Sequence, residues 1–253
     1  MFTHAILRTP CPELIHGITT ASLGTPDYTK ALAQHEAYAA ILESCGLNLR
    51  ILEADSRYPD SVFIEDVAFC TPNCAVITRL GALSRRGETL GIEPVLREYY
   101  QHIEYIYATG TLDAGDVMMV GSHYYIGLSE RTNAVGAAQL IAILERYGLS
   151  GETVPLKTML HLKTGVSYLE KNTLLVYGEF VQYPAFSSFD CIEIDAEEAY
   201  AANSLWVNDR VLVPEGHPKT AKKIADAGYE VIPVAVSEFQ KLDGGLSCLS
   251  LRL

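Results

Sequence analysis

Side chains that could take part in catalysis recur at the starts of short, apolar, strand-like segments. They comprise several acids, one histidine, one amide and one thiol: Glu65, Asp66, Asp113, Asp116, His161, Asn203 and Cys248. A thiolate is a nucleophile and an imidazole transfers protons, so Cys248 and His161 indicate nucleophilic catalysis. Nearby carboxylates normally raise the pKa of a thiol and make it less reactive. They fit this chemistry if the substrate is a planar cation such as a guanidinium, whose N–H groups pair with carboxylates.

These side chains can meet only if the elements that carry them are arranged around a common centre. Residues 66–108 are predicted to form two hairpin strands, a helix over 84–101 and a closing strand. The same order of strand, strand, helix and strand is predicted for 116–156 and 204–234, and in a looser form for 165–194. A unit that recurs at this spacing is typical of propellers and solenoids.

The two ends of the chain supply the parts of a fifth unit. Its first strand would come from 247–253, its second from 3–8, its helix from 27–46 and its last strand from 47–53. The tail is therefore expected to be ordered, because its strand closes a ring by pairing with the head. The alternative is a two-layer α/β domain with a doubly wound sheet, in which Cys248 need not meet the other chemical side chains.

Composition narrows the class of protein and of partner. The chain has 253 residues, 49% of them apolar, and a formal net charge of −12. The apolar share predicts a folded domain with a sizeable core. The excess of acids argues against a nucleic-acid or anionic-membrane surface and favours a small cation. No signal peptide and no apolar run of about 20 residues is recognisable, so we expect a cytoplasmic protein with reduced cysteines.

Cysteine and histidine spacings predict neither a metal nor a cofactor. Cys70 and Cys74 are separated by three residues, which is not the CxxC spacing of zinc sites, and no second Cys/His pair answers them. They are better explained as small apolar residues that flank a hairpin turn. We expect no catalytic metal and no cofactor, although a thiol–imidazole pair could trap zinc as an inhibitor.

Seven short motifs occur in an order that carries a family resemblance. They are PDSVFIEDVAFC, GALSRRGE, GTLDAGDVMMVG, IGLSERTN, LHLKTGVSYL, AANSLWVN and KLDGGLSCLSL. Together they resemble the motif series of the dimethylarginine dimethylaminohydrolase family, in the guanidine-modifying (pentein) superfamily. The resemblance covers nearly the whole chain. It implies a five-bladed α/β propeller of ββαβ units, formed as a single catalytic domain by residues 1–253, and it makes a homodimer plausible.

The resemblance also implies a reaction, the hydrolysis of Nω-methylated arginine to citrulline. Cys248 would attack the guanidinium carbon and form a covalent thiouronium intermediate. His161 would protonate the departing methylamine or dimethylamine and then activate water. Asp66 would hold the guanidinium N–H groups, with Glu65 beside it, and Asp113 would orient His161. Some relatives carry Glu at the position of Asp113.

Further residues are implied at the amino-acid end of this small cationic substrate. They are Ile18, Asp60, Arg85, Arg131 and Leu242. The two arginines would clamp the α-carboxylate, and the aspartate with the two backbone carbonyls would bind the α-ammonium group. Residues 16–27 resemble the mobile lid of the family, and their glycines and small polar side chains suit a loop that closes over substrate.

Alternatives remain open within and beyond this chemistry. Arginine deiminases, agmatine deiminases and amidinotransferases use the same kinds of residues. The chain has no room for the extra helical domain usual in arginine deiminases, and two carboxylate-binding arginines favour an amino acid over agmatine. A rival of another class is a non-catalytic propeller that binds a macromolecular partner, which would have no need of the Cys/His pair.

Overall fold

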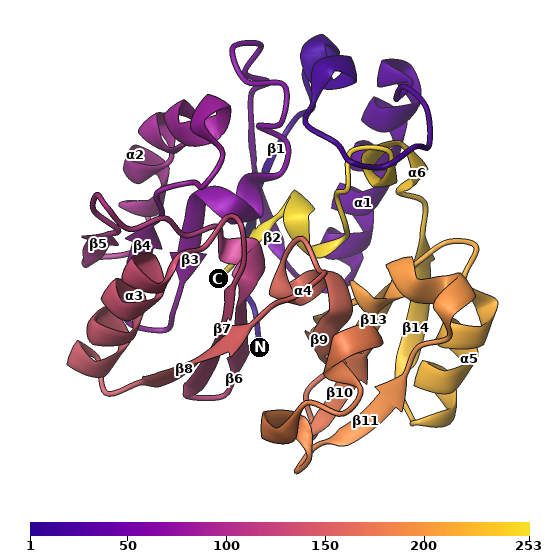
Figure 1. Cartoon of the computed structure of the whole chain (residues 1–253). Coiled ribbons are helices and arrows are strands. Elements are labelled where there is room, and N and C mark those ends of the chain that lie inside the picture. Colours follow the sequence, from indigo (N-terminus) through magenta and orange to yellow (C-terminus); the bar gives the residue numbers. More distant parts are fainter. The chain divides into compact units, whose positions relative to one another are not determined.

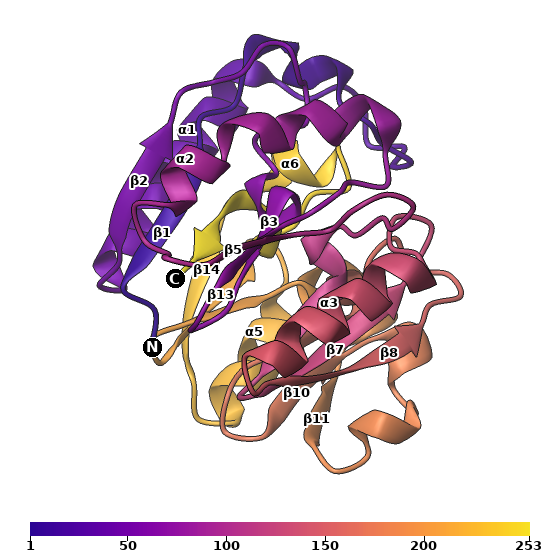
Figure 2. The ribbon, with the colours of Figure 1, turned by 90° about the vertical axis from the view of Figure 1, so that its left-hand side faces the viewer.

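The computed structural model describes all 253 residues, and the chain divides into two compact units. Unit 1 comprises Met1–Ile64 and Gly165–Arg252, and unit 2 comprises Glu65–Thr164 with Leu253. The ribbon is shown from two sides in Figures 1 and 2. None of its helices combines the length and the apolar composition needed to cross a membrane.

The strands form five sheets of three strands each. Unit 2 contains β3 (Ala68–Cys70), β4 (Ala75–Ile77) and β5 (Ile103–Tyr105), and then β6 (Val117–Val120), β7 (His123–Leu128) and β8 (Ser150–Pro155). Unit 1 contains β9 (Val166–Tyr168), β10 (Thr173–Val176) and β11 (Asp190–Glu193); β12 (Leu205–Val207), β13 (Arg210–Pro214) and β14 (Glu230–Val234); and β15 (Leu251–Arg252), β1 (His4–Arg8) and β2 (Asn48–Leu52). In every sheet the first pair is antiparallel and the second is parallel, which confirms the five predicted repeats.

An α-helix lies in the connection between the two parallel strands in four of the five units. The α-helices are α1 (Tyr28–Ser44), α2 (Glu93–Leu96), α3 (Ala134–Arg146), α4 (Leu162–Gly165), α5 (Pro218–Asp226) and α6 (Ser237–Gln240). The 3-10 helices are η1 (Pro12–His16), η2 (Ile64–Val67), η3 (Leu83–Gly91), η4 (Ala114–Asp116), η5 (Gly178–Phe180), η6 (Pro184–Phe186), η7 (Ala196–Ala202) and η8 (Ser247–Leu249). Between β10 and β11 the connection contains only η5 and η6, in agreement with the looser third repeat.

Local sequence explains where the three long helices begin and end. The Asp27 carboxylate accepts the Lys30 N–H at the start of α1, and the Asn133 side chain accepts the Gly136 N–H at the start of α3. Such caps satisfy N–H groups that have no partner inside a helix. Pro218 occupies the first turn of α5, where its missing N–H costs nothing. Past the end of α3, Gly148 has a φ of 73°, a conformation that favours glycine.

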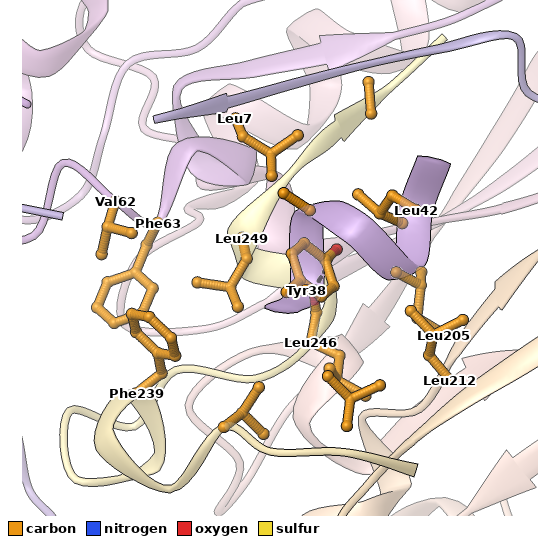
Figure 3. Packing of buried hydrophobic residues seen from close by; sticks show 14 of the residues in the cluster. Leu7, Tyr38, Leu42, Val62, Phe63, Leu205, Leu212, Phe239, Leu246 and Leu249 are labelled. Carbon is orange, nitrogen blue, oxygen red and sulfur yellow. Dashed lines mark hydrogen bonds between the residues drawn. The ribbon is translucent and has the colours of Figure 1, made fainter. Parts of the chain in front are cut away.

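Unit 1 is built on an apolar cluster that includes the tail of the chain. Tyr38 and Leu42 of α1 contact it from one side, and Leu7 of β1 from another. Leu246 and Leu249 lie in the same cluster and are fully buried (Figure 3). Burying large apolar side chains is the main force that orders a chain segment, so the stretch that carries Cys248 is anchored from both sides.

Unit 2 has its own apolar cluster, in which α3 covers the sheet of β6, β7 and β8. Leu140, Ile143 and Leu144 of α3 are buried there, as their helical spacing predicts. Tyr124 and Ile126 come from β7. Figure 2 shows α3 running beside β7 and β8. This packing fixes the loops that lead into and out of the sheet.

The tail pairs with the head as predicted, but the strand is shorter than 247–253. Ile6 and Ala5 of β1 pair antiparallel with Leu251 and Arg252 of β15. Cys248 lies outside the strand, in η8. The reason is that side chains bind the backbone groups that a strand would use: Tyr38 donates from its hydroxyl to the Leu246 carbonyl at 3.0 Å, and Asn203 accepts the Ser247 N–H at 3.0 Å.

The long helix predicted over 84–101 was wrong. The chain instead forms η3 and then the short α2, with irregular turns after it. Gly87 and Gly91 weaken a continuous α-helix, and Pro94 lacks the N–H that its interior would need, so the proline sits in the first turn of α2 instead. This break matters for the site because η3 carries Arg85.

Candidate active site

Unit 2 brings together three of the predicted catalytic side chains, each from a loop that precedes a strand. Asp66 lies in η2 before β3, Asp113 lies just before η4 and β6, and His161 lies just before α4 and β9. One ligand atom from each lies within 4.8 Å of those of the other two. Asp66 and Asp113 are buried, whereas the His161 side chain remains 12% exposed. The cluster is therefore a polar centre with one accessible edge.

His161 is held and charged by its acidic neighbours. Its Nε2 lies 3.3 Å from Asp113 Oδ2, and the Gly81 N–H donates to Asp113 Oδ1 at 2.8 Å. Burial disfavours the imidazolium, but the carboxylates of Asp116, Asp113 and Asp66 outweigh it and raise the pKa of His161 to about 9. A histidine that is protonated at neutral pH can act as a general acid.

The pKa of Asp113 is lowered, as expected for the carboxylate partner of a protonated histidine. Burial would raise it, but the hydrogen bond and charge of His161, the charge of Arg85 and the Gly81 N–H lower it below the usual value. Asp113 Oδ2 lies 3.3 Å from His161 Nε2, so its arm, although shorter than that of Glu, still reaches the imidazole.

Gly115 permits the close approach of His161 and Asp66. An added Cβ at this position would lie 2.9 Å from His161 Nδ1 and 3.1 Å from Asp66 Oδ1. Its N–H donates to Asp66 Oδ1 at 3.0 Å. The glycine of the DAGD motif is thus required by space rather than by backbone conformation.

Asp66 and Arg85 form part of a buried ion-pair chain. Arg85 Nη1 donates to Asp66 Oδ2 at 2.8 Å. Its Nε and Nη2 donate to the two carboxylate oxygens of Glu88, both at 2.9 Å. Burial disfavours the Arg85 charge, yet the two carboxylates raise its pKa well above the usual value. The role predicted for Arg85 at the substrate α-carboxylate stays a prediction.

Two residues of this centre were missed in the sequence. Glu88 is the last residue of the SRRGE stretch and Lys163 follows His161 by two positions, so both lie inside motifs named above. Lys163 donates from Nζ to Glu65 Oε1 at 2.6 Å, and the two side chains are 14% and 5% exposed. The only sequence signal for Glu88 and Lys163 is their position inside these motifs. Sequence spacing does not reveal nearly buried ion pairs such as that of Lys163 with Glu65.

Asp116 links the loop of Arg131 to the start of α4. Its Oδ1 accepts the Leu162 N–H at 2.9 Å, and its Oδ2 accepts the Ser129 hydroxyl at 2.6 Å. The Ser129 hydroxyl oxygen in turn accepts the Arg131 N–H at 3.0 Å. Burial raises the pKa of Asp116. Asp116 therefore fixes the backbone next to His161 and, through Ser129, the backbone of Arg131.

Unit 1 carries the predicted nucleophile in a turn fixed by polar side chains. The Gly245 N–H donates to Cys248 Sγ at 3.4 Å. Asn203 bonds both the N–H and the hydroxyl of Ser247, and Tyr200 donates to the Gly244 carbonyl at 2.7 Å. Asn203, noted in the sequence as a polar residue before a strand, thus supports the Cys248 turn.

The residues predicted at the α-ammonium end also converge in unit 1. The Ile18 N–H donates to Asp60 Oδ1 at 3.0 Å. An added Cβ on the neighbouring Gly17 would lie 2.8 Å from Asp60 Oδ1 and 3.0 Å from Leu242 Cδ1. Asp60 and Leu242 are buried, and Ile18 is exposed. The start of the predicted lid, residues 16–27, therefore contacts a buried carboxylate.

The predicted site residues are divided between the units. Cys248, Ile18, Asp60 and Leu242 belong to unit 1, and Glu65, Asp66, Arg85, Asp113, Arg131 and His161 belong to unit 2. A separate open cavity of about 810 Å³ in unit 1 is lined by parts of 177–197 and Lys219 and includes none of these residues. The atoms of Asp66, Asp113 and His161 are close enough to surround a metal ion, but both carboxylates already accept N–H groups, and the absence of a catalytic metal stays a prediction.

Comparison with known proteins extends these observations to the whole chain. The family model for N,N dimethylarginine dimethylhydrolase, eukaryotic, matches residues 26–250. The N(G),N(G)-dimethylarginine dimethylaminohydrolase of Pseudomonas aeruginosa is 56% identical over 253 residues, which is 100% of both chains. The protein of the same name from Streptomyces coelicolor is 37% identical over 250 residues, 98% of this chain and 96% of that protein.

Solved structures agree in fold. A dimethylarginine dimethylaminohydrolase with histidine replaced by glycine, as its adduct with S-methyl-L-thiocitrulline, matches with a TM-score of 0.99, 56% identity and full coverage of both chains. The P. aeruginosa enzyme with cysteine replaced by serine, complexed with citrulline, matches equally well. The N-terminal domain of the cyanobacterial arginine dihydrolase ArgZ, 19% identical, has a TM-score of 0.88 over 98% of this chain and 97% of that one, which shows likeness of fold alone.

These likenesses and the five three-stranded sheets give the fold class as the five-bladed α/β propeller of the penteins. The family model covers most of the chain, and the P. aeruginosa relative covers all of it. The chain therefore belongs to the dimethylarginine dimethylaminohydrolase family.

Proposed function

We propose that the protein hydrolyses Nω-methylated arginine to citrulline and methylamine or dimethylamine. The observation that carries this proposal is the 56% identity to a dimethylarginine dimethylaminohydrolase over the full length of both chains. The geometry supports it, because Asp66 lies in unit 2 close to a second buried carboxylate, that of Asp113, and to His161, whose pKa is raised to about 9. We also infer that residues 1–253 work as a single catalytic domain, since the family's motifs run through both units.

The first chemical step uses Cys248 and His161. The Cys248 thiolate attacks the guanidinium carbon, whose N–H groups are held by Asp66, so that a C–S bond forms. The C–N bond to the methylated nitrogen then breaks, and His161 gives its proton to the departing amine. Because the pKa of His161 is raised to about 9, the imidazole holds that proton at neutral pH. The product of this step is a thiouronium bound to Cys248.

The second step returns the enzyme to its starting state. His161, now neutral, takes a proton from a water molecule as the water oxygen attacks the thiouronium carbon. The C–S bond breaks, the electron pair returns to Cys248 as thiolate, the hydroxyl proton that came from water passes to solvent, and citrulline leaves. Asp113 keeps the imidazole oriented through both steps, and Glu65 lies beside Asp66 with its charge compensated by Lys163.

The amino-acid end of the substrate is bound by separate groups in this proposal. Arg85 and Arg131 bind the α-carboxylate. Asp60 and the carbonyls of Ile18 and Leu242 bind the α-ammonium group, and the loop 16–27 closes over it. The substrate is a small cationic amino acid.

The experiment is an assay of ureido products from dimethylarginine, monomethylarginine, arginine and agmatine. We expect the methylarginines to be the best substrates and Cys248→Ser to lose turnover by several orders of magnitude, since the variant lacks the nucleophile. Cys191→Ser, which removes an exposed thiol, is the matched control and should keep wild-type rates. Faster turnover of arginine or agmatine would establish a deiminase instead, and undiminished turnover by Cys248→Ser would remove the nucleophile.

A further inference from the structure

The side chain of Glu88 occupies a position that the reaction as written does not use. It is 1% exposed and pairs with Arg85, which is 7% exposed and three residues earlier in η3. Both of its oxygens accept from Arg85, one from Nε and one from Nη2, each at 2.9 Å. This bidentate pairing fixes the plane of the Arg85 guanidinium.

The pairing determines how Arg85 meets Asp66. With Nε and Nη2 taken by Glu88, Arg85 reaches Asp66 through Nη1, which lies 2.8 Å from Oδ2. The Gly115 N–H binds the other oxygen, Oδ1, at 3.0 Å. A carboxylate oxygen has two lone pairs, so Asp66 can still accept further N–H groups on both oxygens.

Arg85 carries the same chemical group as the substrate. A guanidinium that is free to turn pairs with a carboxylate through two parallel N–H groups, and an Arg85 released from Glu88 would do so with Asp66. Such pairing would fill Oδ1, which already accepts the Gly115 N–H, and leave Asp66 a single lone pair, on Oδ2. The enzyme's own guanidinium would then compete with the guanidinium of the substrate.

We infer that Glu88 is a positioning residue that restrains Arg85, so that Asp66 remains available to the guanidinium group of the substrate. The inference rests on the proposed function, in which Asp66 binds that group. Glu88 and Asp66 also both compensate the buried positive charge of Arg85, because each carboxylate forms an ion pair with it. It does not touch the reacting atoms.

The test compares two ligands that differ at one end only. Dimethylarginine and citrulline share the α-carboxylate and α-ammonium groups, but dimethylarginine ends in a cation and citrulline in a neutral ureido group. Binding is measured by calorimetry in the Cys248→Ser background, where turnover does not interfere. The ratio of the two Kd values reports the guanidinium end, whatever Arg85 does at the carboxylate.

We expect Glu88→Gln to weaken dimethylarginine by roughly tenfold or more relative to citrulline, the scale of one buried charge-assisted hydrogen bond. Adding Arg85→Met should restore the ratio toward the Cys248→Ser value, since the internal competitor is gone. Glu93→Gln is the matched control, because Glu93 pairs with Arg97 on the surface of α2. An unchanged ratio in Glu88→Gln, or no recovery in the double variant, would overturn the inference.

A replacement variant and separate tests of the proposed function complete the experiment. If Glu88→Gln does not fold, Glu88→Asp replaces it: the charge is kept but the shorter arm cannot hold both donors, and the same loss of ratio is expected, an unchanged ratio again counting against the inference. The parent Cys248→Ser protein and the wild-type assay test the proposed function on their own. Failure there, with no binding of dimethylarginine and no citrulline formed, refutes that function irrespective of Glu88.

Discussion

At the scale of single residues, His161 derives its chemistry from the carboxylates around it. Burial alone would favour the neutral imidazole, and a neutral ring could not protonate an amine leaving group. Asp116, Asp113 and Asp66 reverse that preference. The same carboxylates would raise the pKa of a nearby thiol, so a cationic substrate that compensates them fits the site better than a neutral one.

The variant Asp113→Asn tests this arrangement through the pH profile. The proposed acid is the protonated His161, so the rate falls as pH rises through its pKa, about 9. Asn keeps the size of the side chain but removes one of the charges that raise that pKa. The basic limb of kcat/KM, which reports ionisations of the free enzyme, should therefore move to lower pH, by roughly one unit.

The control for this profile is Asp226→Asn, which removes an exposed carboxylate paired with Lys222 in α5. Its profile should match the wild type. A basic limb that stays in place in Asp113→Asn would show that His161 is not the group whose ionisation limits the rate.

At the scale of elements, hydrogen bonds join the predicted lid, residues 16–27, to the segment that precedes the Cys248 turn. The Thr20 N–H and hydroxyl both donate to Asp243 Oδ2, at 2.6 Å and 3.0 Å. The Thr19 hydroxyl donates to the Lys241 carbonyl at 2.9 Å. Since Asp243 directly precedes the two glycines before Cys248, it connects the predicted lid, residues 16–27, to the turn that carries the predicted nucleophile.

Asp243→Gly removes this tie without straining the backbone, because Asp243 has a φ of 58° and glycine adopts that conformation readily. We expect faster amide hydrogen exchange at Thr20 and a several-fold higher KM, in proportion to the lost charge-assisted bonds. Asp209→Gly, at a φ of 73° in the β12–β13 turn, is the matched control for added flexibility. Equal exchange and KM in the two variants would show that Asp243 does not hold the lid.

At the scale of the whole molecule, the periodic part of the structure was predictable and the irregular part was not. Alternating apolar segments predicted the five sheets, and helical spacing predicted α3 with Leu140 and Leu144 inward. The tail was expected to pair with the head, and β15 does so with β1. These features follow from local periodicity, which sequence displays directly.

The helix expected over 84–101 failed for a local reason, because its own glycines and proline break it. The other features that failed depend on contacts between distant residues. The strand expected at Cys248 became η8 because Tyr38 and Asn203 take the backbone groups around it. Likewise, no spacing rule indicates that Glu88 fixes Arg85, or that Lys163 pairs with Glu65 across 98 positions. The residue types of the site could be read from the motifs, but their ion pairs had to come from the structure.

The most direct test of covalent catalysis uses His161→Gly with S-methyl-L-thiocitrulline. The methanethiolate group leaves without a proton from His161, so the first step proceeds, whereas hydrolysis lacks its base. Intact-mass measurement with peptide mapping should then find the thiouronium adduct on Cys248, with one methanethiol released per chain. A protein that stays unmodified, or an adduct confined to another cysteine, would contradict the account.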